Sequence, residues 1–415
     1  MPDTESGVAS RAAGLIRLDE FSGEAALRYQ KQRNFDRGPE RRDNVSMLSP
    51  FLRHRLILER EVLTSVLARH SATAVSRYVE EVFWRAYYKG WLEQRPTVWS
   101  TYRADVGRLL TRLDADKMLL ERYETAVAGR TGIDCFDVWA RELVDTGYLH
   151  NHTRMWFASI WVFTLELPWQ LGADFFYRHL VDGDPASNTL SWRWVCGLHT
   201  RGKTYLARAS NISKCTDNRF HPRGLSPVAE PLTEAVAHSL KPLPTAQVAP
   251  RGERYGLLIT EEDCNPESLA LHSEPVAIAA TSSVEHRSPL PVGQIARAFT
   301  LAALEDTEQR AAGHFGAAVD SLAGDDLASA LLDWAGANDL DQIVTAYCPV
   351  GPAAERLATA REKLIQKGIR LIQLRRGYDS RAWPHATAGY FKLKSRIPML
   401  LEHLEADVET HAAAS

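Results

Sequence analysis

Two patterns of hydrophobic positions divide the chain. Up to about residue 220, apolar residues recur at three- and four-residue spacing, as in "RHRLILEREVLTSVLARH" (53–70) and "AVSRYVEEVFWRAYYKGWLEQ" (74–94), and strand-like alternation is scarce. This spacing places apolar side chains along one side of a helix. We therefore expect an all-α N-terminal domain over residues 21–220, preceded by a flexible N-terminus at residues 1–20.

Beyond the first half, short apolar runs alternate with helical stretches. The runs "YGLLIT", "PVAIAAT", "QIVTAYCPV" and "RLIQL" predict strands, whereas "GQIARAFTLAALEDTEQRAA" and "AAERLATAREKLIQKGI" predict helices. Strands separated by helices form βαβ units with a parallel sheet and right-handed crossovers. The prediction is a C-terminal α/β doubly wound, Rossmann-like domain over residues 254–405, followed by a flexible tail at 406–415.

A proline-rich segment separates the two patterns. It reads "HPRGLSPVAEPLTEAVAHSLKPLPTAQVAPRGER", and its prolines exclude long helices. We interpret residues 221–253 as an interdomain linker with one short helix at most. The fold class is therefore multi-domain, which agrees with a length of 415 residues.

Composition narrows the classes of function. The net charge is −3, so any contact with nucleic acid needs a local basic patch. Five scattered cysteines, without spacing suited to zinc, predict a reducing compartment and no metal. The sequence shows no signal peptide and no apolar run long enough to span a bilayer, so a cytoplasmic location without membrane contact is expected.

Two segments combine polar side chains with an unusual share of the eleven tryptophans. In "TGYLHNHTRMWFASIW" (146–161), helical spacing would place Asn151, Arg154 and Met155 on one face. This pattern fits either an aromatic core helix with a polar rim or the wall of a pocket for a large flat cofactor. In "DGDPASNTLSWRW" (182–194), Asp184 would cap a helix begun by Pro185, which leaves Asp182 free to pair with an arginine such as Arg154.

These motifs resemble the FAD-binding helical domain of the DNA photolyase and cryptochrome family. The resemblance covers about 200 residues and rests on "TGIDCFDVWARELVDTGYLHNHTRMW", "LVDGDPASNTLSWRW", "YQKQR", "VSMLSPFL" and "EVFWRAYY", which occur in the family's order. It implies FAD as cofactor. The residues that the resemblance assigns to FAD binding are Tyr29, Ser46, Leu48, Ser49, Arg85, Asn151, Arg154, Asp182, Asp184 and Asn188.

The resemblance also implies a substrate pocket and an electron route. Glu81, Trp84, Asn151, Met155 and Trp194 match the family's pocket for a cyclobutane pyrimidine dimer. Trp192 and Trp169 match the proximal and middle members of its tryptophan chain. The distal position falls near Asp116, so Tyr123, Trp99 and Trp156 are unranked candidates for it.

The order of the two units departs from that of the family, in which the α/β domain precedes the flavin domain. "LDQIVTAYCPVGPAAERLATAREKLIQKGIRLIQL" resembles the second half of the family's α/β domain, and "YGLLITEEDCNPESLAL" its opening strand and helix. We interpret the chain as a circularly permuted relative; an unrelated α/β domain fused behind is the alternative. The crevice at the carboxyl ends of its strands could hold an antenna chromophore, such as a folate or a deazaflavin.

The function expected from the resemblance is light-dependent repair of UV-damaged DNA. On this interpretation the protein splits cyclobutane pyrimidine dimers by electron transfer from photoexcited reduced FAD. A cryptochrome-like photoreceptor without repair activity is the main alternative, and a flavin protein without a light function is a third. The oligomeric state stays open, with a monomer as the default. Five basic residues are candidates for contacts with the DNA backbone: Arg53, Arg55, Lys203, Arg219 and Arg223.

Overall fold

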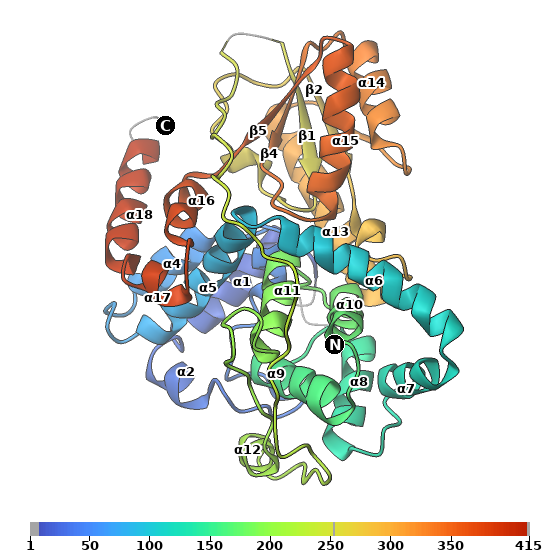
Figure 1. Cartoon of the computed structure of the whole chain (residues 1–415). Helices are drawn as coiled ribbons and strands as arrows, with labels where there is room; N and C mark the ends of the chain where they lie inside the picture. The colour runs from blue at the N-terminus through green and yellow to red at the C-terminus, as the bar shows by residue number, and fades with distance from the viewer. Residues whose placement is uncertain (1–7, 252–253, 413–415) are drawn as a thin grey trace.

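The structure is a computed structural model that describes residues 8–251 and 254–412, with side chains as far as residue 404. A helical body forms from the first half of the chain, and a parallel sheet flanked by helices follows it in sequence (Figure 1). The helices of the body and their bounds are α1 (Arg11–Ser22), α2 (Leu27–Gln32), α3 (Ser49–Arg53), α4 (Glu59–Leu67), α5 (Ser76–Glu93), α6 (Thr97–Ala115), α7 (Lys117–Val127), α8 (Asp134–Thr146), α9 (Asn151–Ser159), the π-helical turn η2 (Ile160–Thr164), α10 (Trp169–His179), α11 (Pro185–Val195) and α12 (Ala209–Cys215).

The helical prediction for the first half is confirmed, but its expected lead-in is partly wrong. Residues 11–20, assigned to a flexible N-terminus, belong to helix α1, while residues 1–7 lie outside the described part. The Ser10 hydroxyl caps this helix by accepting a hydrogen bond from the Ala13 amide at 3.1 Å. Leu18 and Phe21 are buried in the core. Burial of this apolar face stabilises a helix that the sequence alone indicates only weakly.

The sheet contains five parallel strands in the order β3-β2-β1-β4-β5. The four predicted strands are confirmed, and a short fifth strand, β3, was missed because it has no apolar run and lies largely exposed. The strand bounds are β1 (Gly256–Thr260), β2 (Ala277–Thr281), β3 (Val319–Ser321), β4 (Gln342–Ala346) and β5 (Arg370–Leu374).

Helices cover both faces of the sheet, as a doubly wound topology requires. They are α13 (Gln294–Phe315), α14 (Leu327–Ala337) and α15 (Pro352–Gln366). Alternate residues of β1 face opposite sides: Leu257 belongs to the core that includes α13 and the helical body, whereas Leu258 packs in the core with α14 and α15. The α13 face of the sheet is therefore continuous with the helical body.

The helix expected after β1 does not form. The segment after β1 contains only the 3-10 turn η3 (Pro266–Ser268), because its backbone contacts the helical body: the Cys264 amide donates to the His54 carbonyl at 2.7 Å. The described residues of the proline-rich segment, 221–251, also lack a helix. Their backbone instead pairs with the helical body, with Leu232 donating to Cys196 and Lys241 to Gln94.

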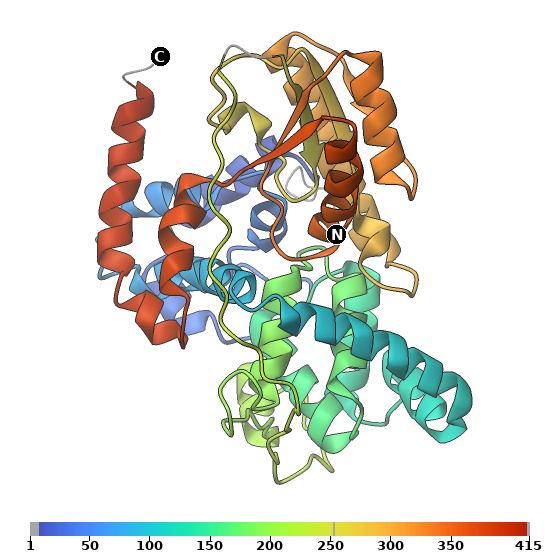
Figure 2. The same cartoon turned by 45° about the horizontal axis from the view of Figure 1, so that its top comes forward.

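The chain beyond β5 returns to the helical body. Helices α16 (Gly377–Ala382), α17 (Tyr390–Lys394) and α18 (Ile397–Ala412) lie beside α4 and α5 in both views (Figures 1 and 2). Trp383 is fully buried against Gly90, where a Cβ atom would lie 2.7 Å from the Trp383 Cα atom. The α/β assignment of this segment is therefore corrected, as is the flexible tail, since residues 406–412 continue α18.

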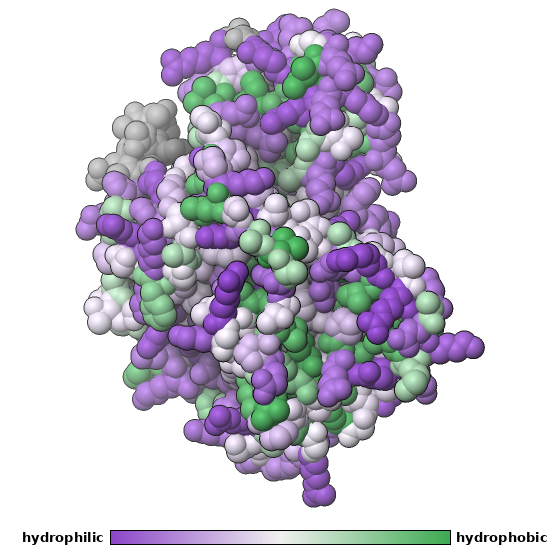
Figure 3. Space-filling model, viewed as in Figure 1, coloured by the Kyte–Doolittle hydropathy of each residue, from purple (hydrophilic) through white to green (hydrophobic). Residues whose placement is uncertain are grey.

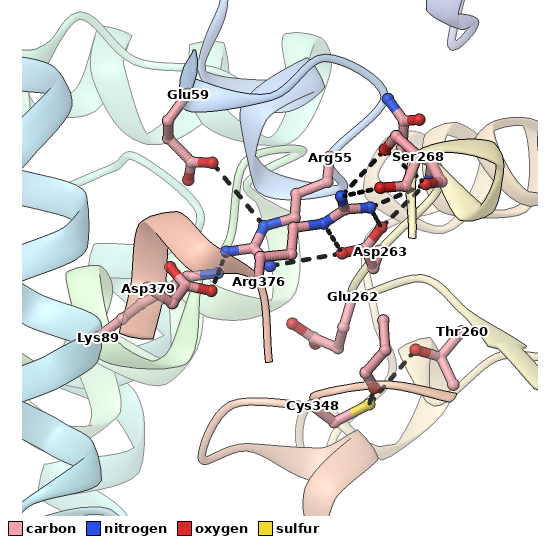
Figure 4. Close-up of polar contacts among 12 residues, drawn as sticks. Arg55, Glu59, Lys89, Thr260, Glu262, Asp263, Ser268, Cys348, Arg376 and Asp379 are labelled. Carbon is pink, nitrogen blue, oxygen red and sulfur yellow. Dashed lines mark hydrogen bonds and ion pairs between the residues drawn. The ribbon is translucent and has the colours of Figure 1, made fainter. Parts of the chain in front are cut away.

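Buried ion pairs join the carboxyl end of β1 to the helical body. Arg53, 1% exposed, donates to both carboxylate oxygens of Glu262 at 2.7 Å and to the Gly183 carbonyl at 2.7 Å. Arg55 contacts Asp263 and Asp379, and Arg376 binds Asp263 through two nitrogens at 2.6 Å (Figure 4). The crevice at the point where the strand order reverses is thus filled by paired charges.

The outer surface in the view of Figure 3 is mostly hydrophilic, with hydrophobic residues in small separate patches. Among the described residues, no helix is both long enough and apolar enough to cross a bilayer.

Replacing Arg53 by leucine should strongly destabilise the protein. Breaking a buried ion pair from one side costs about 3–5 kcal/mol, because the other charge stays buried without a partner. Urea-induced unfolding would measure the loss. The matched control is Arg69→Leu, whose exposed pair with Asp19 should contribute about 1 kcal/mol or less. Removing both charges, in Arg53→Leu with Glu262→Leu, should recover part of the loss. Equal unfolding midpoints for the Arg53 and Arg69 variants would contradict a stabilising role for the buried pair.

Candidate functional site

A cavity of about 530 Å³ opens among α2, α3, α5, α9, α11 and the loop before α11. This volume lies in the range that accommodates cofactors and other small ligands. Every predicted cofactor, substrate and electron-transfer residue lines it except Leu48 and Trp169. The predicted residues in the lining are Tyr29, Ser46, Ser49, Glu81, Trp84, Arg85, Asn151, Arg154, Met155, Asp182, Asp184, Asn188, Trp192 and Trp194.

The acidic loop at the floor of the cavity has the predicted local geometry. Asp184 caps α11, accepting a hydrogen bond from the Ser187 amide at 2.7 Å, and Pro185 occupies the first helical position. Burial opposes ionisation of Asp184, but the positive charges of Lys89 and Arg53 outweigh it and lower its pKa well below the usual range. Asp184 is therefore an ionised group at physiological pH.

Asp182 pairs with Arg154, as the sequence predicts, at 2.9 Å between carboxylate Oδ2 and guanidinium Nη2. Burial raises the pKa of Asp182, but the charge and hydrogen bond of Arg154, with smaller contributions from Ser49 and Arg85, together leave the pKa below its usual value. The Arg154 Nε atom also donates to the Leu149 carbonyl at 2.9 Å. This second bond fixes the guanidinium at the start of α9.

Several buried polar atoms of the lining have no hydrogen-bond partner among the described residues. They are Asp182 Oδ1, Arg85 Nε and Nη2, Ser187 Oγ and Trp192 Nε1. Buried polar groups in native proteins are almost always paired, so a cluster of unpaired ones around a cavity indicates a polar ligand. The unpaired donors suit a ligand with phosphate-like oxygens, and the unpaired acceptor, Asp182 Oδ1, suits a ring N–H group of the ligand.

Asn188 and Leu48 are held in place by different contacts. Asn188 Nδ2 donates to the Ala173 carbonyl at 2.8 Å, which fixes the side-chain amide beside α10. Leu48 is fully buried and precedes α3 as its N-cap residue. Its side chain is thus part of the core, and its backbone orients the neighbouring Ser49 of the lining.

Aromatic side chains and Glu81 form another part of the cavity lining. Arg33 forms an ion pair with Glu81. Burial raises the pKa of the Glu81 carboxyl, and the charge of Arg33 only partly offsets this effect. Trp84 stacks on Tyr390 and Trp194 packs against Tyr205. Trp84, Met155 and Trp194 thus contribute apolar surface to the same cavity lining as the Glu81 carboxyl group.

Sequence reasoning missed three of these residues for different reasons. Arg33 ends the "YQKQR" motif, so the motif itself contained the signal. Tyr205 follows the tryptophan motif without a spacing rule that would single it out. Tyr390 lies in the segment assigned to the α/β domain, and only the folded chain places it beside Trp84.

The aromatic contacts of Trp192 lead to a residue that the sequence does not predict. The Trp192 ring lies 6.2 Å from that of Trp161, which lies 6.2 Å from Tyr123. Trp169 stacks on Tyr102 at 5.7 Å and does not line the cavity. Trp192, Trp161 and Tyr123 therefore form a connected series of rings that begins at the cavity wall.

The expected basic rim is partly wrong. Arg53 and Arg55 are 1% and 2% exposed and serve the ion pairs described above, so neither can contact a strand outside the protein. Lys203, Arg219 and Arg223 are exposed, and Arg219 pairs with Asp36. The expectation for Arg53 and Arg55 failed because charged residues usually lie on the surface, and the sequence does not reveal their distant ion-pair partners.

Part of the helical body is similar to known proteins. Residues 78–224 match the family model described as the FAD binding domain of DNA photolyase. The deoxyribodipyrimidine photo-lyase of Streptomyces griseus is 35% identical over 159 residues, which are 38% of this chain and 33% of that protein. The enzyme of the same name from Agrobacterium fabrum is 32% identical over 186 residues, 44% of this chain and 37% of that protein.

Similarity to solved structures covers a similar part of the chain. A bacterial class III photolyase from Agrobacterium tumefaciens is 27% identical, with a TM-score of 0.40, over 50% of this chain and 43% of that one. The chain thus spans well under half the length of the curated relatives it matches. Most of the cavity lining lies within residues 78–224, the part of the chain that is similar to the FAD binding domain of DNA photolyase.

The residues present fit FAD. Tyr29, Ser46, Ser49 and Arg85 offer donors on one side of the cavity, and the unpaired Arg85 nitrogens suit a pyrophosphate. The unpaired Asp182 Oδ1 suits a ring N–H, and the Asn188 amide lies on the same side, beside α10. The cofactor prediction is confirmed at the level of the domain, and the role of each residue stays a proposal.

Replacing Arg154 by methionine should weaken FAD binding. A hydrogen bond to a charged group contributes ~1.5–3 kcal/mol, so the dissociation constant of FAD should rise at least about tenfold. Fluorescence titration of the apoprotein with FAD would measure it. Arg141→Met is the control, because Arg141 binds the Gly129 carbonyl and does not line the cavity. A dissociation constant unchanged in the Arg154 variant would rule out this role.

Proposed function

We propose that this chain is a light-dependent DNA repair enzyme that splits cyclobutane pyrimidine dimers. The observation that supports the proposal is the lining of one cavity by both sets of residues. Asp182 and Asp184 of the loop before α11 line it together with Glu81, Trp84 and Trp194. A cofactor and a flipped pyrimidine dimer would thus be neighbours in a single site.

The protein's own residues would bind and orient the lesion. Trp84, Met155 and Trp194 offer apolar contacts for two bases turned out of the duplex, which costs less at a distorted site. Glu81 would hydrogen-bond a pyrimidine edge, and burial raises the pKa of its carboxyl group. The chemistry that FAD supplies when bound and reduced is a light-driven electron that opens the dimer.

The electron route to the cavity is part of the proposal. The family resemblance assigns it to Trp192 and Trp169. The ring contacts favour a route from Trp192 through Trp161 to Tyr123, which is buried but keeps 8% of its surface exposed. We propose Trp161 as the middle member, because its ring contacts both neighbours whereas the Trp169 ring contacts Tyr102.

A cryptochrome-like photoreceptor is the second candidate. Two observations favour it: the net charge is −3, and Arg53 and Arg55, which were expected at a DNA-binding rim, are buried in ion pairs. Weak attraction for phosphate would suit a protein partner better than DNA. The Glu81 and Trp84 pair in the cavity favours repair.

Other expectations stay predictions. We retain the division into two domains near residue 253, the circular permutation, a cytoplasmic location and a monomeric state on the sequence arguments alone. An antenna chromophore, a folate or a deazaflavin, also stays a prediction. Its expected crevice between β1 and β4 holds Glu262 and Asp263, which pair with Arg53 and Arg55 of the helical body, and Cys348, which contacts Thr260. A chromophore would therefore need a different position on the sheet.

Blue light should restore intact thymines in an oligonucleotide that contains a cyclobutane thymine dimer, given protein with reduced FAD. Glu81→Gln should lower the repair rate about tenfold, because it loses a hydrogen bond to a charged or proton-sharing group. Glu121→Gln, on the exposed side of α7, is the control. The return of thymine absorbance measures repair in single- and double-stranded DNA. Bound FAD without repair in either substrate would favour the photoreceptor.

Trp161→Phe should slow the light-driven loss of oxidised flavin absorbance severalfold in the presence of an external thiol, because phenylalanine is harder to oxidise than tryptophan. Trp169→Phe is the matched comparison and should retain most of the wild-type rate. Time-resolved absorbance after a light pulse would measure both variants. A normal rate in Trp161→Phe with a slow rate in Trp169→Phe would return the middle position to Trp169.

A further inference from the structure

The segment after the sheet reaches the aromatic wall of the cavity. Tyr390, the first residue of α17, is 5% exposed and stacks on Trp84, with ring centroids 3.7 Å apart and planes inclined by 11°. Its hydroxyl donates to the Glu80 carbonyl at 2.9 Å. Tyr390 therefore backs the tryptophan that lines the cavity on its other side.

Several bonds hold this segment against α5. The Tyr87 hydroxyl donates to the Ala388 carbonyl at 2.9 Å, and Arg95 Nη2 donates to the Thr387 carbonyl at 2.7 Å. Lys394 pairs with Glu80 at 2.9 Å. Residues 387–394 are thus fixed beside the cavity wall.

The outer side of α17 combines an exposed ring with positive charge. Phe391 is 79% exposed, and no other aromatic side chain in the described part of the chain stands among the exposed large hydrophobic residues. Lys392 and Arg396 are exposed, and the Lys394 Nζ atom lies 6.0 Å from the Phe391 ring centroid. Burial lowers the pKa of His385, and the charges of Arg396 and Lys392 lower it further, which shows that the cations cluster.

An exposed aromatic ring is unfavourable in water unless a partner covers it. The sequence "YFKLKSR" interleaves rings and cations, and the carboxylate of Glu80, the acid bound to this segment, is already paired with Lys394. Single-stranded nucleic acid combines flat bases with phosphates and therefore complements both features. Tyr390 of α17 also connects this helix with the cavity lining, because its ring stacks on Trp84.

We propose that the outer side of α17 binds the nucleic-acid strand next to the lesion, with Phe391 stacking on a base and Lys392 contacting a phosphate. This inference rests on the proposed function. Tyr390 would act as a positioning residue that holds Trp84, and Phe391 would extend the aromatic wall outside the cavity.

Binding of an undamaged, fluorescently labelled single-stranded oligonucleotide in the dark tests the proposal. Phe391→Ala should weaken binding about fivefold or more, because one stacked base is lost. Lys392→Gln should lower the slope of log affinity against log salt by about one. The controls are Met118→Ala, a similarly exposed apolar residue on α7, and Lys367→Gln, an exposed lysine after α15. FAD absorbance and thermal unfolding would confirm that each variant is folded.

A second substrate separates this inference from the proposed function. The isolated dinucleotide dimer has no flanking strand, so its repair tests the cavity alone. Repair of the dinucleotide with weakened strand binding in Phe391→Ala supports both proposals. Unchanged strand binding in both α17 variants, or wild-type protein that binds no strand, overturns the inference. Wild-type protein that binds the strand through Phe391 but repairs neither substrate overturns the proposed function alone.

Discussion

The guanidinium of Arg53 joins the two parts of the molecule to each other and to the cavity. It donates to both oxygens of Glu262 after β1 and to the carbonyl of Gly183, which lies between the two aspartates of the cavity loop. A buried charge is costly unless it is fully paired. A shift of Arg53, Glu262 or the Gly183 carbonyl would therefore leave a buried group without its partner. Its charge, with that of Lys89, also keeps Asp184 ionised as the cap of α11. The geometry of the flavin site is therefore coupled to the position of the sheet.

Local signals in the sequence are sufficient for the polar side of the site. The cap formed by Asp184 and Pro185, and the helical spacing of Asn151 with Arg154, depend on neighbours in the chain, and both are present in the structure. The pair of Arg154 with Asp182 spans only 28 residues between recognisable motifs. In contrast, the partner of Arg53 lies 209 residues away. A single sequence does not reveal such a distant pair, so it suggests surface positions for Arg53 and Arg55 although both are buried.

The prediction for the last helices failed for a related reason. Their apolar spacing shows that they bury one face, but it does not show against which surface. Trp383 fills the space left by Gly90 on α5, and this contact depends on the shape of both partners. The short strand β3 was missed because its residues are largely exposed and an apolar run is the main strand signal. Hydrophobic pattern thus predicts which elements form, whereas shape complementarity decides where they pack.

The order of the units along the chain gives the second half two direct roles around one cavity. The loop after β1 fixes the polar floor through Arg53 and Gly183, and α17 fixes the aromatic wall through the stack of Tyr390 on Trp84. The first contact comes from the loop after β1, and the second from a helix that follows β5, the last strand of the sheet. A helical body without residues 254–404 would lack support on both sides of the cavity. The sheet is therefore best understood as a scaffold for the flavin site, whatever else it binds.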